Sequence, residues 1–236
     1  LRKRNSKEGV NIMTIHSCGW RMLLRTYGSK IKMDENKSIG KTEQVIKKLN
    51  LPVQRTGYYF YIIPKIIDLM RCNLCENTQE GIQALVDRYN IDIEENDYKA
   101  IMLAFKYHTA DKNRFDFTDM IYVPVVDKAV RFTKYDFVFC DESQDFSLCQ
   151  QAFIKNCLNR KGRLVTVGDP NQAIYGFAGA DAESYENLAN LNGKAIKLPL
   201  SVSYRCAKNI VVEARKIVPE INYAPDSPYG VVEEGS

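Results

Sequence analysis

The stretch "DFVFCDESQDFSLCQQAFIKNCLNRKGRLVTVGD" (136–169) decides the fold class, because two apolar runs flank an amphipathic segment. The first run, 136–140, predicts a strand, the segment 147–159 predicts a helix, and 162–169 predicts a second strand. Strands that alternate with helices indicate a parallel sheet. Both runs are apolar almost throughout, which predicts strands that are covered on both faces. We therefore expect an α/β fold.

Segments with the same two patterns lie on either side of this stretch. "VNIMTI" (10–15) is rich in β-branched residues, and "KAIKLPL" (194–200) forms another apolar run. The further strands that we predict are 10–15 and 194–200. The further helices that we predict are 16–28, 116–132 (disturbed by Pro124), 182–192 and 207–218.

Residues 31–113 differ in character from the rest of the chain. Four segments carry apolar residues at three- and four-residue spacing, which predicts short amphipathic helices: 41–50, 61–74, 78–90 and 97–110. This helical segment would be inserted between two pieces of one α/β domain. Its basic residues could face phosphates or simply form solvated helix faces: Lys30, Lys32, Lys37, Lys41, Lys47, Lys48 and Arg55.

The composition fits a globular chain in a reducing compartment. Of the 236 residues, 45% are hydrophobic, and the formal net charge of +4 neither requires nor excludes a nucleic-acid partner. There is no run of eighteen apolar residues, so we expect no membrane span. The odd count of 7 cysteines favours free thiols and a cytoplasmic location. Cys72 and Cys75 form one CxxC, but a structural zinc site needs four ligands, so we expect buried thiols.

Carboxylates follow both central strands at the point where each strand ends. Asp141, Glu142 and Asp145 follow the first strand, and Asp169 follows the second. Ligands of parallel α/β sheets bind at these strand ends, where Mg²⁺ and phosphates are held. A solvated turn is the alternative. The next connection, "VGDPNQAIYGFAGA" (167–180), favours a site, because it combines an amide suited to phosphate with aromatic rings suited to bases. A glycine-rich turn with two anchoring aromatics is the competing interpretation.

Five segments together resemble a known family. They are "TIHSCGWRMLL" (14–24), "FDFTDMI" (115–121), "DESQD" (141–145), "VGDPNQAIYGFAGA" (167–180) and "LSVSYRC" (200–206). Their order and spacing resemble those of the UvrD/Rep-like superfamily 1 DNA helicases. The resemblance implies a RecA-like sheet domain of the P-loop NTPase type (1–30 and 114–200), with an inserted all-helical subdomain (31–113). Residues 201–236 would begin a second RecA-like domain.

The resemblance also implies an activity and its residues. The protein would couple ATP hydrolysis to 3′→5′ movement on single-stranded DNA and to unwinding at junctions with duplex. Asp141 resembles the aspartate that holds Mg²⁺, and Glu142 the carboxylate that polarises the attacking water. Gln172 resembles the γ-phosphate sensor, Arg205 the arginine finger, and Tyr204 the aromatic that stacks on adenine.

The DNA-binding residues implied by the resemblance are Thr14, His16, Ser17, Tyr175 and Phe177. Thr14, His16 and Ser17 would reach the backbone, and the aromatics would meet bases. Taken alone, His16 is more typical of a helix start or a core. Phe115 and Phe117 taken alone are also more typical of a core than of a DNA contact.

Two departures from the family pattern limit what the resemblance implies. Ala178 stands where many members have arginine, so the coupling between nucleotide and DNA is open at this position. The phosphate loop G-x-x-x-x-G-K-[ST] does not occur in residues 1–236. "IGKT" (39–42) has neither the first glycine nor a preceding strand, so we expect no phosphate loop there. We expect the loop upstream of Leu1, and no helicase-like ATP turnover by this chain alone.

Two other functions remain as alternatives. One is a catalytically inactive, helicase-like module that binds DNA or docks a partner. The intact set Asp141, Glu142, Gln172 and Arg205 argues against such decay. The other is a nuclease, whose metal centre would have no use for Gln172, Tyr204 and Arg205.

Overall fold

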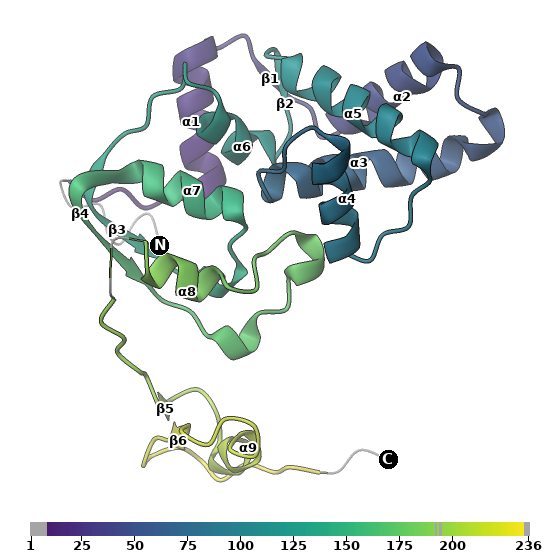
Figure 1. The fold of residues 1–236 in the computed structure, drawn as a ribbon. Helices are drawn as coiled ribbons and strands as arrows, with labels where there is room; N and C mark the ends of the chain where they lie inside the picture. Colours follow the sequence, from purple (N-terminus) through teal and green to yellow (C-terminus); the bar gives the residue numbers. More distant parts are fainter. Residues whose placement is uncertain (1–8, 192, 194, 234–236) are drawn as a thin grey trace. The chain divides into compact units, whose positions relative to one another are not determined.

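The computed structural model describes residues 9–191, 193 and 195–233 (Figure 1). The chain divides into two compact units, Leu1–Gly193 and Lys194–Ser236, which we call the first and second units and describe separately. The α-helices of the first unit are α1 Ile15–Tyr27, α2 Lys37–Leu49, α3 Thr56–Cys72, α4 Gln79–Arg88, α5 Glu95–Ala110, α6 Asp119–Val126, α7 Leu148–Cys157 and α8 Ser184–Ala189. Its short 3₁₀ turns are Val53–Arg55, Ser143–Asp145, Pro170–Gln172 and Gly176–Ala178.

A parallel strand pair with a crossover helix forms the α/β part of the first unit. Strands β3 (Tyr135–Cys140) and β4 (Leu158–Thr166) are parallel, and α7 connects them. The side chain of Ser147 caps α7 by accepting a hydrogen bond from Gln150 N–H. The parallel arrangement predicted for 136–169 is confirmed. The mixed helix and strand composition with small parallel sheets also agrees with the predicted α/β class.

The prediction that both faces of these strands are covered is wrong for the described residues. Phe137 is 56% exposed and Phe139 is 74% exposed on β3. Val165 and Val167 are exposed to 41% and 52% beside them. An apolar run therefore indicated a strand correctly, but it did not indicate which face the chain covers.

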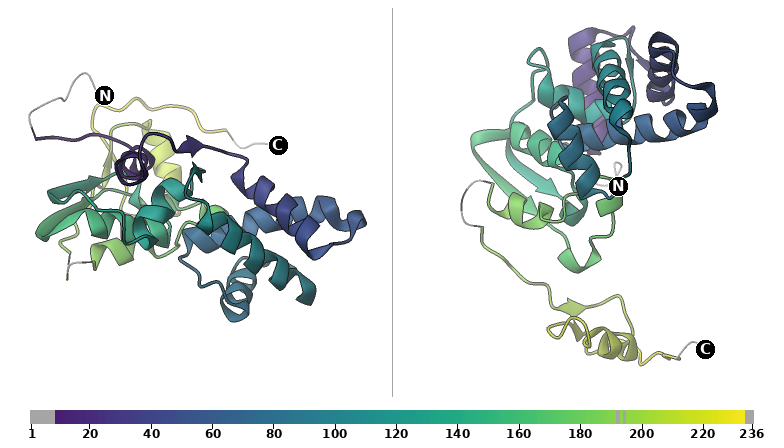
Figure 2. Two further views of the ribbon diagram at one scale, coloured as in Figure 1. Left: turned by 90° about the horizontal axis from the view of Figure 1, so that it is seen from above. Right: turned by 45° about the vertical axis from the view of Figure 1, so that its right-hand side comes forward.

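A second strand pair lies where the helical segment begins and ends. β1 (Lys32–Met33) pairs in parallel with β2 (Arg114–Phe115), so residues more than eighty positions apart become neighbours. Helices α2 to α5 lie between these strands in sequence, close to the ranges predicted for them. The views of Figures 1 and 2 agree that these helices gather on one side of the first unit, and the β3–β4 pair lies on the other.

The two sides of the first unit nevertheless share one core. Leu23 of α1, Ile67 of α3 and Ile101 of α5 are fully buried in a single apolar cluster. Helix α1 also packs directly against the backbone of α6, since a Cβ on Gly19 would lie 1.7 Å from the Met120 carbonyl oxygen. The helical segment and the α/β part are therefore held together by apolar packing.

Several predicted elements of the first unit differ from the observed ones. Residues 10–14 form no strand, and the chain enters α1 at Ile15. The helix predicted over 116–132 is confined to Asp119–Val126, with Pro124 inside it, because 116–118 form a turn. Residue 192, the last of the predicted 182–192 helix, lies outside the described residues, and α8 ends at Ala189.

The described residues of the second unit form one helix and one short strand pair. Strands β5 (Val202–Ser203) and β6 (Asn222–Tyr223) are parallel, with α9 (Lys208–Ala214) between them in sequence. The strand predicted over 194–200 does not form in residues 195–200, and residue 194 lies outside the described residues. Ile196, Leu198 and Leu200 are 81–90% exposed, so this apolar run has no strand to pair with in the described chain.

The described helices include none whose length and apolar character would suffice to cross a bilayer. All seven cysteines belong to the described residues, and each carries a free thiol.

Candidate functional site

The ends of β3 and β4 bring the predicted carboxylates together. The Val167 N–H donates to the Cys140 carbonyl at 2.8 Å, and the Ser143 N–H donates to the Val167 carbonyl at 3.0 Å. These bonds continue the pairing beyond the strands, so Asp141 and Glu142 lie beside Gly168. Asp141 and Glu142 are both exposed at this edge. The first unit thus presents carboxylates at the carboxyl ends of two parallel strands, as predicted.

Gln144 connects the two strand ends through its amide. Its Nε2 donates to Glu142 Oε2 at 2.8 Å and to Asp145 Oδ2 at 3.3 Å. Its Oε1 accepts from the Asp169 N–H at 3.1 Å. A Cβ at Gly168 would lie 2.5 Å from this Oε1, so only a glycine allows the amide to reach the second strand. One buried side chain therefore fixes the position of Glu142 relative to β4.

Glu142 itself has a backbone conformation that is unusual for a residue with a side chain. Its φ of 53° and ψ of 43° lie in the left-handed region. That conformation costs roughly 1–2 kcal/mol for an L-residue and persists only where surrounding contacts enforce it. The Gln144 bond and the 3₁₀ turn Ser143–Asp145 supply these contacts.

Gln172, the predicted phosphate-sensing amide, lies in the connection that follows β4. Its Nε2 donates to Asp169 Oδ2 at 2.7 Å; Gln172 is exposed and Asp169 is half-buried at this end of the sheet. Gln172 thus lies beside the strand end, as the sequence predicted, and is oriented by Asp169.

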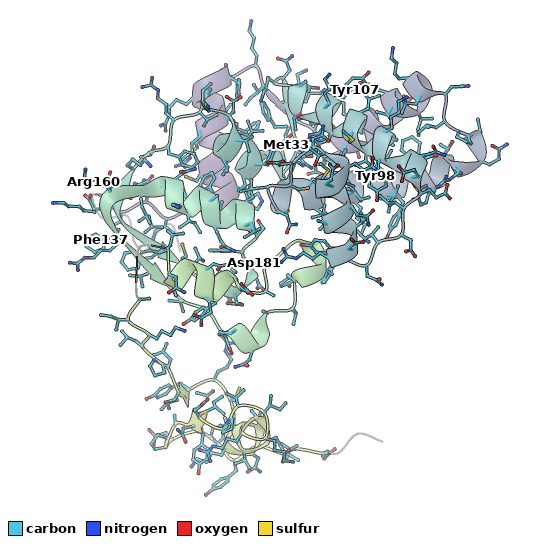
Figure 3. All side chains as sticks on the ribbon, viewed as in Figure 1. Met33, Tyr98, Tyr107, Phe137, Arg160 and Asp181 are labelled. Carbon is cyan, nitrogen blue, oxygen red and sulfur yellow. The ribbon has the colours of Figure 1, made fainter. Side chains whose placement is uncertain are left out.

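The end of this connection is attached to α7 and α8. Asp181, labelled in Figure 3, accepts from Gln151 Nε2 at 2.9 Å and from Asn187 Nδ2 at 2.7 Å. Burial would raise the pKa of Asp181, but these two hydrogen bonds outweigh it and lower the pKa. The backbone of Gly179 also lies against Cys72 at the end of α3, with φ 94°. The segment 170–180 is therefore held at its far end by two buried anchors.

A cavity of about 210 Å³ opens between α1, α6, α7 and this connection. His16 comes from α1, Thr118 from the turn before α6, and Tyr175 from the connection. Asp145 also lines the cavity, so the acidic strand end and the cavity share a residue. We call this the aromatic pocket; its full lining is His16, Cys72, Thr118, Ile121, Asp145, Ser147, Cys149, Gln150, Tyr175, Ala178 and Ala180.

Two exposed aromatic rings contact lining residues of the aromatic pocket: Phe177 contacts Tyr175, and Phe117 contacts His16. Tyr175 is 50% exposed and Phe177 is 75% exposed, and their ring centroids are 6.3 Å apart. Phe117 is 52% exposed, with its ring 5.9 Å from that of His16 in an edge-to-face arrangement. The expectation of a core position is therefore wrong for Phe117. It is confirmed for Phe115, which is fully buried.

The remaining residues of the "TIHS" segment form the start of α1. Thr14 Oγ1 accepts from the Ser17 N–H at 3.1 Å and donates to Ser17 Oγ at 3.1 Å. This capping interaction fixes both hydroxyls at the exposed N-terminal end of the helix. His16 is partly buried beside them, which lowers its pKa.

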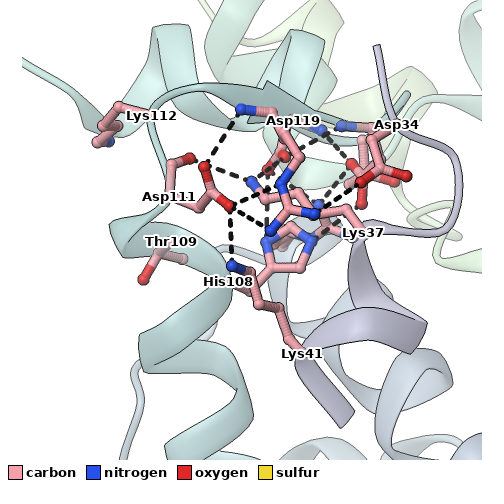
Figure 4. Close-up of polar contacts among 12 residues, drawn as sticks. Asp34, Lys37, Lys41, His108, Thr109, Asp111, Lys112 and Asp119 are labelled. Carbon is pink, nitrogen blue, oxygen red and sulfur yellow. Dashed lines mark hydrogen bonds and ion pairs between the residues drawn. The ribbon is translucent and has the colours of Figure 1, made fainter. Parts of the chain in front are cut away.

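A buried network of charged side chains was not predicted from the sequence. Arg71 of α3 is fully buried, and its Nη1 donates to Asp116 Oδ1 at 2.7 Å and to Asp119 Oδ1 at 3.0 Å. Lys37 of α2 binds Asp119 Oδ2 at 2.6 Å, and His108 Nε2 lies 3.0 Å from Asp116 Oδ2 (Figure 4). Three helices of the 31–113 segment thus contact two carboxylates of the turn before α6. We call these five side chains the buried network.

The buried network contains donor atoms of the kind that bind metals. One atom each of His108, Asp116 and Asp119 lies within 4.8 Å of the others. However, Arg71 and Lys37 already bind the same two carboxylates, so a metal would meet two cations at close range. The arrangement therefore fits an ion-pair network rather than a metal centre.

The two histidines make stability sensitive to acid in a defined pH range. Burial lowers the pKa of His108, and its hydrogen bond with Asp116 only partly opposes this effect. In the unfolded chain a histidine takes up a proton as the pH falls through about 6.5, whereas folded His108 resists protonation. Stability is therefore complete above this pH and is lost as the pH falls below it, by up to about 1.4 kcal/mol per pH unit for one histidine.

Urea unfolding at pH 7.5, 6.5 and 5.5 measures this loss. We expect a smaller loss in His108→Gln, and a further reduction when His16→Gln is added, because the chain has 2 histidines. A double variant that keeps the whole pH dependence in this range would contradict the assignment.

The glycine-lysine-threonine sequence at 40–42 lies inside α2. Lys41 Nζ binds Asp111 Oδ2 at 2.8 Å, and Thr42 Oγ1 donates to the Ser38 carbonyl at 2.9 Å. The expectation that these residues form no phosphate loop is confirmed. Lys37 and Lys41 are also buried, so the basic patch considered for 31–113 is wrong in these two members.

Tyr204 and Arg205 belong to the second unit. They follow β5 directly, and Tyr204 is 82% exposed. The roles predicted for these two residues stay predictions.

Comparison with known proteins identifies the family of this chain. Residues 1–192 match the model of the UvrD/REP helicase N-terminal domain family. ATP-dependent DNA helicase PcrA of Staphylococcus epidermidis is 28% identical over 137 residues, which are 53% of this chain and 19% of that protein. F-box DNA helicase protein 1 of Schizosaccharomyces pombe is 38% identical over 79 residues, which are 34% of this chain and 8% of that protein.

A third relative is the probable DNA helicase II homolog of Mycoplasma capricolum subsp. capricolum. It is 36% identical over 77 residues, which are 33% of this chain and 11% of that protein. The chain thus matches between 8% and 19% of the length of these three relatives.

Proposed function

The chain belongs to the UvrD/REP helicase N-terminal domain family, and from this premise we propose that it forms part of an ATP-dependent DNA helicase. The whole protein would hydrolyse ATP to move 3′→5′ along single-stranded DNA and to unwind duplex at single-strand/double-strand junctions. Within it, residues 1–30 and 114–200 would form a RecA-like domain, 31–113 an inserted helical subdomain, and 201–236 the start of a second RecA-like domain. The parallel β3–β4 pair and the adjacent ends of the helical segment support this division.

The observation that carries the proposal is the shared residue between the acidic strand end and the aromatic pocket. Asp145 accepts a hydrogen bond from Gln144, which also binds Glu142, and Asp145 lines the pocket with His16 and Tyr175. A change at Glu142 can therefore reach the pocket through one amide and one carboxylate. Hydrogen-bonded chains of this kind can carry energetic coupling between a nucleotide site and a DNA site.

The strand-end residues fit the metal and the chemistry of ATP hydrolysis. Asp141 is exposed, and its Oδ1 accepts the Glu142 N–H at 3.1 Å, which orients a hard oxygen donor of the kind that Mg²⁺ prefers. Bound Mg²⁺ would neutralise phosphate charge. Glu142 would polarise the attacking water, with its carboxylate oriented by Gln144.

Three further residues complete the proposed ATPase site. Gln172, oriented by Asp169, would sense the γ-phosphate. From the second RecA-like domain, Tyr204 would stack on adenine and Arg205 would neutralise charge in the transition state. These roles rest on the family to which the chain belongs.

The aromatic pocket would receive DNA bases. Tyr175 lines this pocket, and Phe177 and Phe117 each contact a ring that lines it; all three are exposed, and such rings stack on bases of any sequence. His16 would support Phe117 by its edge-to-face contact. Thr14 and Ser17 would place their hydroxyls near backbone phosphates at the N-terminal end of α1.

Removing the pocket aromatics is expected to weaken binding of single-stranded DNA. Tyr175→Ala and Phe177→Ala should each raise the dissociation constant about 5- to 150-fold, which corresponds to roughly 1–3 kcal/mol per stacked base. Fluorescence anisotropy with a labelled oligothymidine measures this change in the 236-residue chain.

Tyr61→Ala is the matched control for this experiment. Tyr61 is 64% exposed on α3; it does not line the pocket and, unlike Phe177, has no ring contact with Tyr175, so its removal should leave the affinity unchanged. Equal losses in Tyr61→Ala and Tyr175→Ala, or unchanged binding in both pocket variants, would refute the proposed DNA site.

A further inference from the structure

The turn before α6 is closed by its own two carboxylates. The Asp119 N–H donates to Asp116 Oδ1 at 2.9 Å, and the Asp116 N–H donates to Asp119 Oδ2 at 3.2 Å. The residues between them, Phe117 and Thr118, form the tip of the turn. Asp116 and Asp119 are buried, whereas Phe117 projects to contact His16, and Thr118 lines the aromatic pocket. The position of the two tip residues therefore depends on how the two carboxylates are held.

Arg71 is the side chain that holds both carboxylates at once. One guanidinium nitrogen, Nη1, binds Asp116 and Asp119, as described for the buried network. The other, Nη2, binds Asp68, one turn earlier on α3. Asp68 in turn accepts from Thr118 Oγ1 at 3.1 Å. Arg71 thus holds the base of the turn directly and its tip through Asp68.

Lys37 and His108 bind the two outer oxygens of the same carboxylates. Lys37 occupies Asp119 Oδ2 (Figure 4), and His108 occupies Asp116 Oδ2, while Arg71 Nη1 binds Oδ1 of both carboxylates. The planar guanidinium of Arg71 binds three carboxylates in a fixed geometry, two through Nη1 and that of Asp68 through Nη2, whereas the compact ammonium of a lysine has no such rigid fork. The buried network therefore sets an orientation as well as a charge balance.

The burial of Arg71 excludes a direct contact with DNA. Its side chain is 0% exposed. Buried ion pairs add little stability compared with apolar packing, but they can select one geometry among several. A fully buried arginine beneath an exposed aromatic tip fits such a role.

We infer that Arg71 is a positioning residue for the aromatic pocket: by holding the Asp116–Asp119 turn it fixes Phe117 and Thr118 where they meet a DNA base. The helices of the 31–113 segment thereby set the geometry of DNA contact from below the surface. This inference rests on the proposed DNA-binding function of the pocket.

The test is a double-mutant cycle on single-stranded DNA affinity. Arg71→Lys, Phe117→Ala and the double variant are compared by anisotropy in the 236-residue chain, at a temperature where circular dichroism shows each to be folded. We expect Arg71→Lys to weaken binding about 2- to 10-fold, within the usual range of coupling between contacting residues. In the Phe117→Ala background the same substitution should have no further effect.

Salt dependence and two further variants distinguish a positioning role of Arg71 from a direct contact between Arg71 and phosphate. Arg71→Lys should leave the slope of log affinity against log salt unchanged, whereas loss of a phosphate contact would reduce it by about 0.7. Arg131→Lys, the same change at an exposed arginine, should leave binding unchanged. Asp68→Asn removes charge at a half-exposed position and should weaken binding in the same Phe117-dependent way, so the inference stays testable if Arg71→Lys does not fold.

The outcomes distinguish this inference from the proposed function. If Phe117→Ala and Tyr175→Ala both leave DNA affinity unchanged, the proposed function fails. If they weaken binding while Arg71→Lys and Asp68→Asn do not, only the positioning role fails. An Arg71→Lys effect that adds fully to that of Phe117→Ala would also overturn it, because Arg71 would then act by another route.

Discussion

Arg71→Met is expected to lower the free energy of unfolding of the first unit by about 3–5 kcal/mol, because it leaves buried charge without its partner. Arg71 is fully buried between Asp116 and Asp119, and methionine restores its volume but not its charge. The His108 hydrogen bond and the charge of Arg71 together keep the pKa of Asp116 low against the opposing effect of burial. Without Arg71, at least one carboxylate must take up a proton or draw water into the core.

Urea unfolding at pH 7.5, followed by circular dichroism, measures this loss. Lys47→Met is the control, since Lys47 pairs with Glu43 on the surface of α2 with its side chain 74% exposed. Exposed pairs contribute about 0–1 kcal/mol, so this variant should stay near the parent. If Arg71→Met were as stable as Lys47→Met, the buried network would not contribute to the free energy of unfolding.

Glu142→Gln is expected to reduce ATP hydrolysis about 10²- to 10⁴-fold in a protein that joins this chain to a phosphate-binding loop. Glutamine has nearly the shape of glutamate but cannot polarise a water molecule as a base. It can also keep a hydrogen bond to Gln144, so the fold of the strand end and ATP binding should be preserved. Steady-state phosphate release with saturating DNA gives the rate, and fluorescent nucleotide titration gives the affinity.

The control for Glu142→Gln is the same substitution at an exposed carboxylate elsewhere, Glu35→Gln. It should leave both quantities unchanged. Hydrolysis that survives in Glu142→Gln would remove Glu142 from its proposed role. The 236-residue chain without a phosphate loop supplies the baseline, because it lacks the backbone cradle for the β- and γ-phosphates.

Local patterns predicted the central elements well because their determinants are local. The apolar runs around 137–140 and 164–166 and the capping serine at 147 specify β3, β4 and α7 from neighbouring residues alone. The carboxylates at the strand ends followed from this topology. Apolar runs without a pairing partner gave wrong predictions. Strands were predicted at 10–15 and 194–200, but residues 10–14 and 195–200 form none, because a strand requires a neighbour that sequence alone does not reveal.

The buried network was missed because its members are charged residues at core positions of helices. Arg71 lies four residues after buried Ile67, and His108 lies four after buried Ala104, on the apolar face of each helix. A charged residue within an apolar stripe is the signal that could have indicated a buried ion pair. Its partners, eight to eighty-two residues away, could not be assigned without the fold.

Phe117 is an exposed residue that its sequence context placed in the core. Its neighbours Phe115 and Asp116 are buried, and an aromatic residue in an apolar segment is usually buried with them. Its exposure follows from the tight turn that the two aspartates close, which depends on contacts from three distant helices.

The pairing of Lys32 with Arg114 has a consequence for the modularity of this chain. Because β1 and β2 are parallel, a short hairpin cannot join them, and any shorter replacement of the helical segment has to be a crossover connection of about a dozen residues or more. Removal of the helical segment would also leave Asp116 and Asp119 in the core without their partners Lys37, Arg71 and His108. Removal of the segment would therefore lower the stability of the fold. A fusion or deletion made there has to supply other cations to pair with Asp116 and Asp119.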